Sequence, residues 1–429
     1  MISDKLLVPN KIIEFLLIIL PISLLFSNIL SELLILLLII FSVIFLKKEK
    51  FLFFFKEPLI IILIVFWVYL IFNYLINFNN NPSLERTLFF VRFPLLIISI
   101  SFFINILNLN TQKIFFYWGL IILIICIDLF FQYHMHFNLI GNEPIKHGEV
   151  FRLGGFMGDE LKISNLIYHF GVLVFSYFYS KYPNFNKQKL LNFIFLFLFL
   201  IISSIFITGE RSNFITIIFF TFLFIIFLAL TDKKIFIFFA IIFSLILGVL
   251  FASNENLSER MVKKLITKST KIFEFNLNEN FLKKDSHHFA HYSVAYQIFK
   301  KNMAFGSGLK TFRVYCDDDS FDKEIHPKWQ SRKCSTHPHN FYFEILSEIG
   351  IFGFLILIIF FIFAFYEFFK LYRKTKNNYL IISSFILLVY FIPFLPKGSF
   401  FTNWNAMIFW TIFAFIYSNY IKLKKPNEF

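Results

Sequence analysis

The sequence predicts an all-α, polytopic integral membrane protein with about twelve transmembrane helices. Of its 429 residues, 58% are hydrophobic and only 16% are charged, whereas soluble domains average roughly 25% charged residues. The mean hydropathy is +0.71. The apolar residues also fall in long runs, and a helix needs about 20 of them to cross a bilayer. This composition excludes a soluble enzyme, a disordered chain and a disulfide scaffold.

Apolar runs of spanning length follow one another along most of the chain. The first run is not a cleaved signal peptide, because it contains Glu14 and Pro21 and leads almost directly into a second, shorter run. The predicted spans are residues 12–30, 32–46, 58–76, 88–107, 114–131, 161–180, 190–207, 214–230, 235–252, 350–369, 379–396 and 404–421.

Lysine and arginine are abundant in every second inter-span segment, and this alternation predicts the orientation of the chain. Seven segments together carry 19 basic residues, whereas the alternate short loops carry six. Because basic residues favour the cytoplasmic side, the first set and both termini are predicted to be cytoplasmic. The net charge of +14 is then mostly topological and predicts no nucleic-acid partner. The six basic residues of the external loops are Arg86, Lys146, Arg152, Lys162, Arg211 and Lys397.

This orientation divides the chain into three predicted parts. Residues 1–252 hold nine spans, residues 253–338 form an external loop domain, and residues 339–429 hold the last three spans. The loop domain is predicted to be ordered and helical, because residues 258–273 and 286–301 repeat apolar residues at helical spacing. Such helices either lie on the membrane surface or cover a site there.

Two of the three cysteines lie in the external loop domain. Conditions outside the cytoplasm are oxidising, so Cys316 and Cys334 are predicted to form a disulfide. In the loop-entropy model, such a closure stabilises the fold by about 3 kcal/mol.

Ionisable residues gather at the predicted external ends of the spans rather than in mid-membrane. An ion-coupled transporter needs such groups near the midplane, so this distribution favours an enzyme whose site opens at the external face. Two structural alternatives stay open: Arg211 as an anchor at the membrane interface, and Arg92 with Asp128 as a pair between neighbouring helices. The gathered residues are Arg92, Asp128, Glu210, Arg211, His337 and His339.

The segment His337-Pro338-His339-Asn340 lies just before the tenth predicted span. A histidine is the usual general base near neutral pH, and Pro338 favours an extended chain that turns His337 and His339 to the same side. Two other interpretations stay open: a hydrogen-bonded histidine pair at the interface, and a metal site. The further ligands of such a metal site would be Cys334, Asp317, Asp318 and Asp319.

The region around these histidines resembles the O-antigen ligase and O-antigen polymerase family. His339-Asn340 is followed after nine residues by Gly350 and after two more by Gly353, and the whole string CSTHPHNFYFEILSEIGIFG (334–353) is similar to that family. The other similar stretches are RLGGFMGDE (152–160), TGERSN (208–213), and Phe299-Lys300-Lys301 followed by Gly306-Ser307-Gly308 and Phe312-Arg313.

The resemblance implies a membrane glycosyltransferase of the GT-C type in the bacterial inner membrane, with its active site facing the periplasm. The donor would be a glycan carried on undecaprenyl diphosphate. The acceptor would be a sugar hydroxyl of lipid A–core or of another glycan. Members of this kind work without a metal ion, and the resemblance implies no other cofactor.

By position, the resemblance makes His339 the catalytic base and Arg211 the first diphosphate-binding arginine, since a guanidinium pairs bidentately with phosphate oxygens. The ligases are expected to carry a further loop arginine. Arg313 is the candidate for it, because the predicted loop helix carries His287, His288 and His291 instead of an arginine. The remaining predicted substrate-binding residues are Glu210, His337 and Arg92, and Glu344 is predicted to lie behind them.

Several related activities share these motifs. An O-antigen ligase, a polymerase of the same family and a protein O-oligosaccharyltransferase would use the same kind of donor and differ in the acceptor. A transporter of lipid-linked glycan and a zinc enzyme are the alternatives from other classes.

Overall fold

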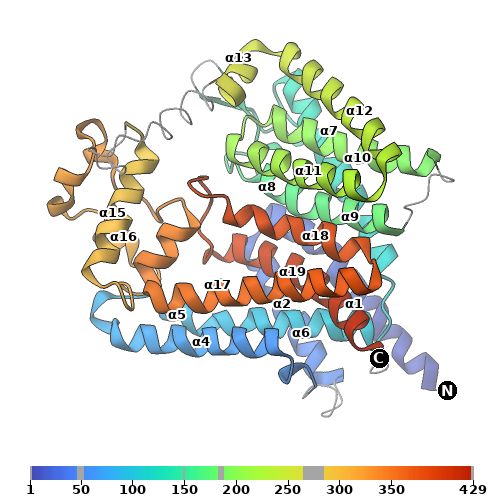
Figure 1. The fold of residues 1–429 in the computed structure, drawn as a ribbon, viewed down its shortest axis with the longest axis horizontal. Helices are drawn as coiled ribbons and strands as arrows, with labels where there is room; N and C mark the ends of the chain where they lie inside the picture. Colours follow the sequence, from blue (N-terminus) through green and yellow to red (C-terminus); the bar gives the residue numbers. More distant parts are fainter. Residues whose placement is uncertain (1, 46–52, 148–149, 182–187, 264–284, 427–429) are drawn as a thin grey trace.

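A computed structural model describes residues 2–45, 53–147, 150–181, 188–263 and 285–426 as a bundle of helices with one small hairpin (Figure 1). The hairpin strands β1 (Ile145–His147) and β2 (Val150–Arg152) are antiparallel, and Ile145 pairs with Arg152. The main helices are α1 (Ile2–Phe26), α2 (Asn28–Phe45), α4 (Pro58–Ile76), α5 (Leu84–Leu88), α6 (Arg92–Asn105), α7 (Thr111–Met135), α8 (Ile163–Leu166), α9 (Val172–Lys181), α10 (Gln188–Ile207), α11 (Arg211–Thr231), α12 (Lys233–Ser253), α13 (Glu255–Ser258), α15 (His287–Lys301), α16 (Phe312–Tyr315), α17 (Phe341–Thr375), α18 (Asn378–Leu388) and α19 (Asn403–Lys424).

Nine helices of the described residues are long and apolar enough to cross a membrane. The all-α, multi-pass membrane class is therefore confirmed, while the count of twelve spans stays a prediction. Each of the nine helices contains or overlaps one predicted span. They are Asn28–Phe45, Pro58–Ile76, Leu84–Asn105, Thr111–Met135, Lys189–Ile207, Arg211–Thr231, Lys233–Ser253, Phe341–Thr375 and Asn403–Lys424.

Two predicted spans differ from continuous helices. Residues 161–180 form α8, a π-helical turn and then α9, rather than one regular helix. The predicted span 379–396 was too long, because the helical segment Asn378–Phe391 ends before Pro393 and Pro396. Proline lacks a backbone N–H and disfavours helical backbone in the residue before it. The chain after Phe391 is therefore free to form a loop at the end of the bundle.

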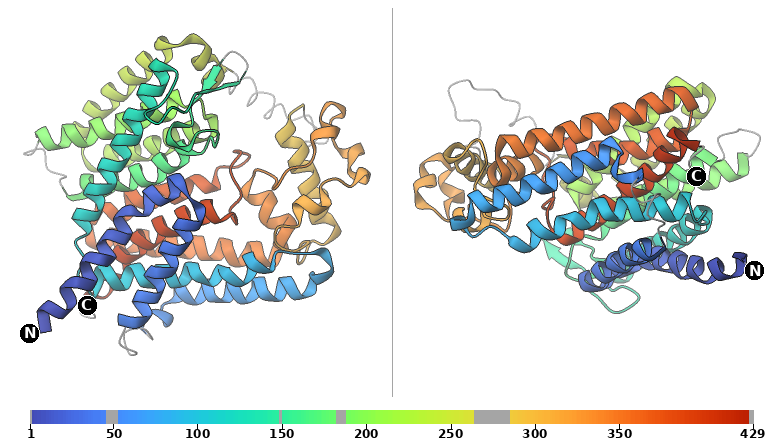
Figure 2. Two further views of the ribbon diagram at one scale, coloured as in Figure 1. Left: turned by 180° about the vertical axis from the view of Figure 1, so that it is seen from behind. Right: turned by 90° about the horizontal axis from the view of Figure 1, so that it is seen from below.

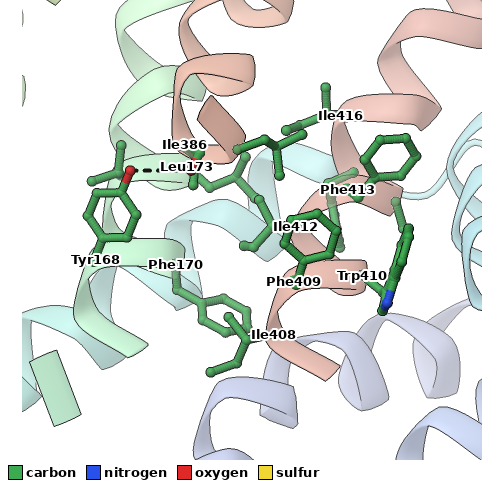
Figure 3. Packing of buried hydrophobic residues seen from close by; sticks show 14 of the residues in the cluster. Tyr168, Phe170, Leu173, Ile386, Ile408, Phe409, Trp410, Ile412, Phe413 and Ile416 are labelled. Atoms are coloured by element: carbon green, nitrogen blue, oxygen red, sulfur yellow. Dashed lines mark hydrogen bonds between the residues drawn. The ribbon is translucent and has the colours of Figure 1, made fainter. Parts of the chain in front are cut away.

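Helix α19 forms the centre of the core. Its side chains Phe409, Trp410 and Phe413 are fully buried, and Ile408 of the same helix lies beside Phe170 of the π-helical turn (Figure 3). The ring centroids of Phe93 on α6 and Trp410 are 5.9 Å apart. Many of the phenylalanines thus serve as packing groups in the core.

Helix α17 is broken at Gly350, where φ is 67° and ψ is −172°. A Cβ there would lie 2.4 Å from the Ala304 carbonyl oxygen, so only glycine fits. The segment 303–308 crosses α17 at this break and replaces the lost helical bonds. The Ser307 N–H donates to the Ser347 carbonyl (2.9 Å), and the Gly308 N–H donates to the Glu348 carbonyl (2.8 Å). Gly350 of the family-like string therefore marks a close backbone crossing, whereas Gly353 lies against the side chains of Tyr69 and Ile349.

The loop domain is helical, as predicted, where the structure describes it. Helix α15 matches the predicted helix 286–301, and Cys316 and Cys334 form the predicted disulfide. For the predicted helix 258–273, only α13 and a π-helical turn over Glu259–Lys263 fall within the described residues; residues 264–284 lie outside them. The further views show α15 at one end of α4 and α17, with α1 and the C-terminus toward the other (Figure 2). We call these the α15 end and the opposite end.

Candidate functional site

A cavity of about 630 Å³ opens at the α15 end of the bundle. It lies between the start of α11, the start of α19, the loop after α18 and the first turn of α15. Segments that are far apart in the sequence thus meet around one space. The lining residues are Arg152, Leu161, Lys162, Asn165, Glu210, Arg211, Ser212, Asn213, Arg260, His287, His288, His339, Tyr390, Pro396, Lys397, Gly398, Trp404 and Asn405.

The turn before α11 brings three arginines to this cavity. Gly209 has φ +73°, and a Cβ there would lie 3.4 Å from Arg152 Cγ, so the turn fits closely against β2. The Arg260 Nε–H donates to the Gly209 carbonyl oxygen at 3.1 Å. Arg152 forms an ion pair with Glu210, and Arg211 follows directly as the first residue of α11.

The lining carries a large excess of positive charge. Among the described residues that line it, five are basic and Glu210 is the single acid. Burial, with repulsion from Arg260 and Arg211, lowers the pKa of Arg152 to about 10. Within the described part of the chain, the Arg211 guanidinium makes no hydrogen bond or ion pair. The cavity is therefore suited to an anion with several oxygens, such as a diphosphate.

His339 lies at the same cavity and is held by its neighbours. Asn340 caps α17, because its side-chain oxygen accepts from the N–H groups of Tyr342 and Phe343. His339 itself has φ 56°, in the left-handed region. Its carbonyl oxygen accepts from the Lys397 N–H at 2.8 Å. The cap and this bond fix the imidazole at the entrance of α17.

The rings of three further histidines surround that of His339. The ring centroid of His337 lies 4.1 Å from that of His339, and those of His291 and His288 lie at 5.3 Å and 5.6 Å. Burial, followed by the charges of neighbouring histidines, lowers the pKa of His339 to about 3. The pKa of His291 falls to about 4, again chiefly through burial. His339 is therefore neutral at pH 7, with one ring nitrogen unprotonated.

A buried polar network lies behind the histidine segment. The Lys310 ammonium contacts a Glu344 carboxylate oxygen at 3.0 Å, and both side chains are buried. Glu344 also accepts from the Ser399 hydroxyl and from the Phe400 N–H. The network joins the 306–311 turn, the first turn of α17 and the loop after α18. It therefore fixes the two segments that carry His339 and Lys397, and Glu344 occupies the supporting position predicted for it.

The cavity brings together three of the six predicted site residues, namely Arg211, Glu210 and His339. His337 contacts His339 from behind and does not line the cavity. Arg313 is exposed on α16 and is also absent from the lining. Glu210 lines the cavity but is paired with Arg152.

Arg92 lies outside the cavity and is not paired with Asp128, so that structural interpretation was wrong. The Arg92 guanidinium donates to the Asn403 side chain at 2.8 Å and lies 4.0 Å from Glu32. Asp128 accepts from the Leu139 N–H at 2.9 Å. Arg92 thus connects α6 to α19, and Asp128 connects α7 to the loop that follows it.

Cys334 is not available as a ligand for the metal site that the sequence suggested beside His337 and His339. The Cys334 sulfur is bonded to Cys316, and a disulfide supplies no thiolate to a metal. Asp318 pairs with Lys301, and Asp319 pairs with Lys333.

Four basic residues of the lining were not predicted as site residues. Three of them could have been found from the sequence, because they lie in the predicted external loops. The positive-inside rule expects few basic residues in those loops. The fourth, Arg260, lies in a long basic segment and gives no such signal. The four are Arg152, Lys162, Lys397 and Arg260.

The fold and this cavity define a multi-pass membrane protein with a cationic pocket and a histidine at one end of its helices. Residues 196–358 match the family model described as O-antigen ligase. For that part of the chain, the match confirms the resemblance to the O-antigen ligase and polymerase family. It supports a membrane glycosyltransferase acting on lipid-linked glycans. No curated protein matches the chain.

Proposed function

We propose that the protein is an O-antigen ligase-like glycosyltransferase. It would move a glycan from undecaprenyl diphosphate to a sugar hydroxyl of lipid A–core, at the periplasmic face of the bacterial inner membrane. The observation that carries this proposal is the meeting of Arg152, Arg211, Arg260 and His339 around one cavity. Both termini would then lie in the cytoplasm.

In this proposal His339 is the general base. The Ser335 hydroxyl lies 3.1 Å from His339 Nε2, and it can accept from an Nε2–H, which leaves the Nδ1 lone pair for the acceptor proton. The acceptor oxygen then attacks the anomeric carbon as its proton moves to His339. Base assistance of this kind contributes typically 10²–10⁴-fold to the rate.

The arginines would bind the leaving group. As the anomeric C–O bond breaks, negative charge develops on the lipid diphosphate, and guanidinium groups pair with its oxygens. Arg211 is the first candidate, because it has no partner of its own among the described residues. Arg152 and Arg260 flank it and add charge to the same wall. The single displacement predicts inversion at the anomeric carbon.

An in vitro transfer assay with a defined lipid-linked donor tests this function. Transfer to purified lipid A–core supports a ligase, and extension of the carrier-linked glycan alone supports a polymerase. A glycosylated polypeptide would identify a protein O-oligosaccharyltransferase. Movement of intact donor across a membrane, without any new glycosidic bond, would support a transporter and contradict the proposal.

A further inference from the structure

A second, smaller cavity of about 220 Å³ lies at the opposite end of the bundle. Helices α18 and α19 connect the two cavities: Tyr379 and Ser418 line the smaller one, whereas Tyr390 and Trp404 line the larger one. The smaller cavity thus lies where the sequence predicts the cytoplasmic face. Its lining residues are Ile104, Asn105, Thr111, Phe115, Tyr177, Ser180, Lys181, Asn377, Tyr379, Phe415, Ser418, Asn419 and Lys422.

Three buried polar atoms of this lining have no hydrogen-bond partner among the described residues. They are Asn105 Oδ1, the Tyr379 hydroxyl and the Ser418 hydroxyl. Their residues are 1%, 7% and 1% exposed. The Asn105 amide is held in place, since its Nδ2–H donates to the Ser418 carbonyl at 2.9 Å. Buried polar groups in proteins are nearly always hydrogen-bonded, so these atoms together call for a ligand that offers both a donor and acceptors.

The mouth of the smaller cavity is cationic. Lys181 and Lys422 are exposed there, and no aspartate or glutamate is found among the described lining residues. The rings of Phe115 and Tyr177 stack with centroids 4.3 Å apart and form an apolar wall. Basic pockets between transmembrane helices on the cytoplasmic side are typical sites for anionic lipid headgroups.

We propose that this cavity binds the phosphoglycerol headgroup of an anionic membrane phospholipid. The phosphate would lie between Lys181 and Lys422. The glycerol hydroxyl would donate to Asn105 Oδ1, and the ester oxygens would accept from the hydroxyls of Tyr379 and Ser418. An apolar wall would receive the first part of the acyl chain. A phosphocholine headgroup has the same phosphate, but its quaternary ammonium is repelled by the lysine pair and it has no hydroxyl to donate to Asn105.

This site is independent of the proposed transfer reaction, since none of its residues lines the larger cavity. If the protein showed no glycan transfer, the proposal of a lipid site in the smaller cavity would still stand. A failure to bind lipid would likewise leave the assignment of His339 and Arg211 unchanged.

Native mass spectrometry of the detergent-purified full chain tests the proposal, with titrations of phosphatidylglycerol and phosphatidylcholine. We expect preferential binding of phosphatidylglycerol. The double variant Lys181→Gln/Lys422→Gln should weaken it by roughly 30-fold, equivalent to about 1 kcal/mol per lysine. The matched control Lys233→Gln/Lys234→Gln removes two exposed lysines predicted to face the same side, which are absent from the lining. It should bind as the wild type does.

A conservative variant separates the headgroup site from general charge. Tyr379→Phe keeps the ring and removes only the unpartnered hydroxyl, so it should weaken phosphatidylglycerol binding severalfold without lowering the melting temperature. Equal binding of the two lipids would overturn the proposal, as would equal losses in the two lysine double variants. Binding of free glycerol 3-phosphate as tightly as the lipid would identify a soluble anion as the ligand and overturn the lipid assignment.

Discussion

The two ends of the helix bundle both carry basic residues, but they carry them in different ways. At the α15 end, five basic side chains from separate segments converge on one cavity with a single acid. At the opposite end, the basic residues are more numerous and spread over many loops, and only two of them line the smaller cavity. We expect charge at the opposite end mainly to set the orientation of the chain, whereas basic side chains at the α15 end line a cavity.

The comparison teaches how to separate topological charge from functional charge in a membrane protein. Of the six basic residues predicted for the external short loops, four line the large cavity. Basic residues that run against the predicted orientation rule thus mark the segments that line this cavity. These four residues are Arg152, Lys162, Arg211 and Lys397.

The largest expected effect is on the histidine at the α15 end. We expect His339→Ala to lower the rate of glycan transfer by about 10²–10⁴-fold, because the acceptor hydroxyl loses its base. Initial rates with a lipid-linked donor measure this loss. His134→Ala, an exposed histidine outside the cavity, is the control and should transfer at the wild-type rate. Equal rates for the two variants would remove His339 from the chemistry.

The buried network behind the cavity should dominate stability. Lys310→Met leaves the Glu344 carboxylate buried without its counter-ion, which costs about 3–5 kcal/mol of unfolding free energy. Denaturant unfolding in detergent measures it. The control Lys328→Met breaks an exposed pair with Asp285 and should cost under about 1 kcal/mol. Adding Glu344→Gln to Lys310→Met should recover part of the loss, and a further loss would contradict the account.

Arginines that line the cavity should contribute more to the affinity for a lipid diphosphate than Arg313, the exposed arginine on α16. We expect Arg260→Gln to weaken binding of a lipid diphosphate by roughly 10–100-fold, the value of a charge-assisted hydrogen bond. Arg313→Gln should change it less than about twofold. Calorimetric titration of both variants decides between them, and the reverse ranking would restore Arg313 as the second diphosphate arginine.

The smallest effect concerns pH. Burial lowers the pKa of Lys397 to about 7, so its ammonium is charged below pH 7 and neutral above it. Diphosphate binding should therefore weaken severalfold as pH rises from 6 to 8, since the cavity loses one positive charge near the bound anion. Lys397→Arg keeps its charge and should flatten this dependence. An unchanged slope in that variant would exclude Lys397 as the titrating group.

Much of the fold could be predicted from the sequence, because apolar runs of spanning length and helical periodicity are local signals. The loop helix α15 and the Cys316–Cys334 bridge were predicted in this way. The shortened α18 was predictable too, since Pro393 and Pro396 stop a helix. The π-helical turn around His169 was not predictable in this way, because no proline precedes or follows it closely in the sequence.

The composition of the site was harder to predict, because it depends on contacts between distant segments. Arg152 and Glu210 are 58 residues apart, and their pairing requires the β1–β2 hairpin to lie against the turn before α11. No local pattern specifies that contact. The family resemblance marked Arg211 and His339 by position, and it gave no means of choosing Arg260 over Arg313.

The binding of undecaprenyl diphosphate by purified wild-type protein and Arg211→Ala tests the central claim most directly. Arg211 lines the large cavity together with His339, so its loss should weaken binding by at least about tenfold. The opposite-end variant Lys422→Gln should bind this ligand as the wild type does. If both variants bound as tightly as the wild type, the cationic cavity at the α15 end would not be the diphosphate site.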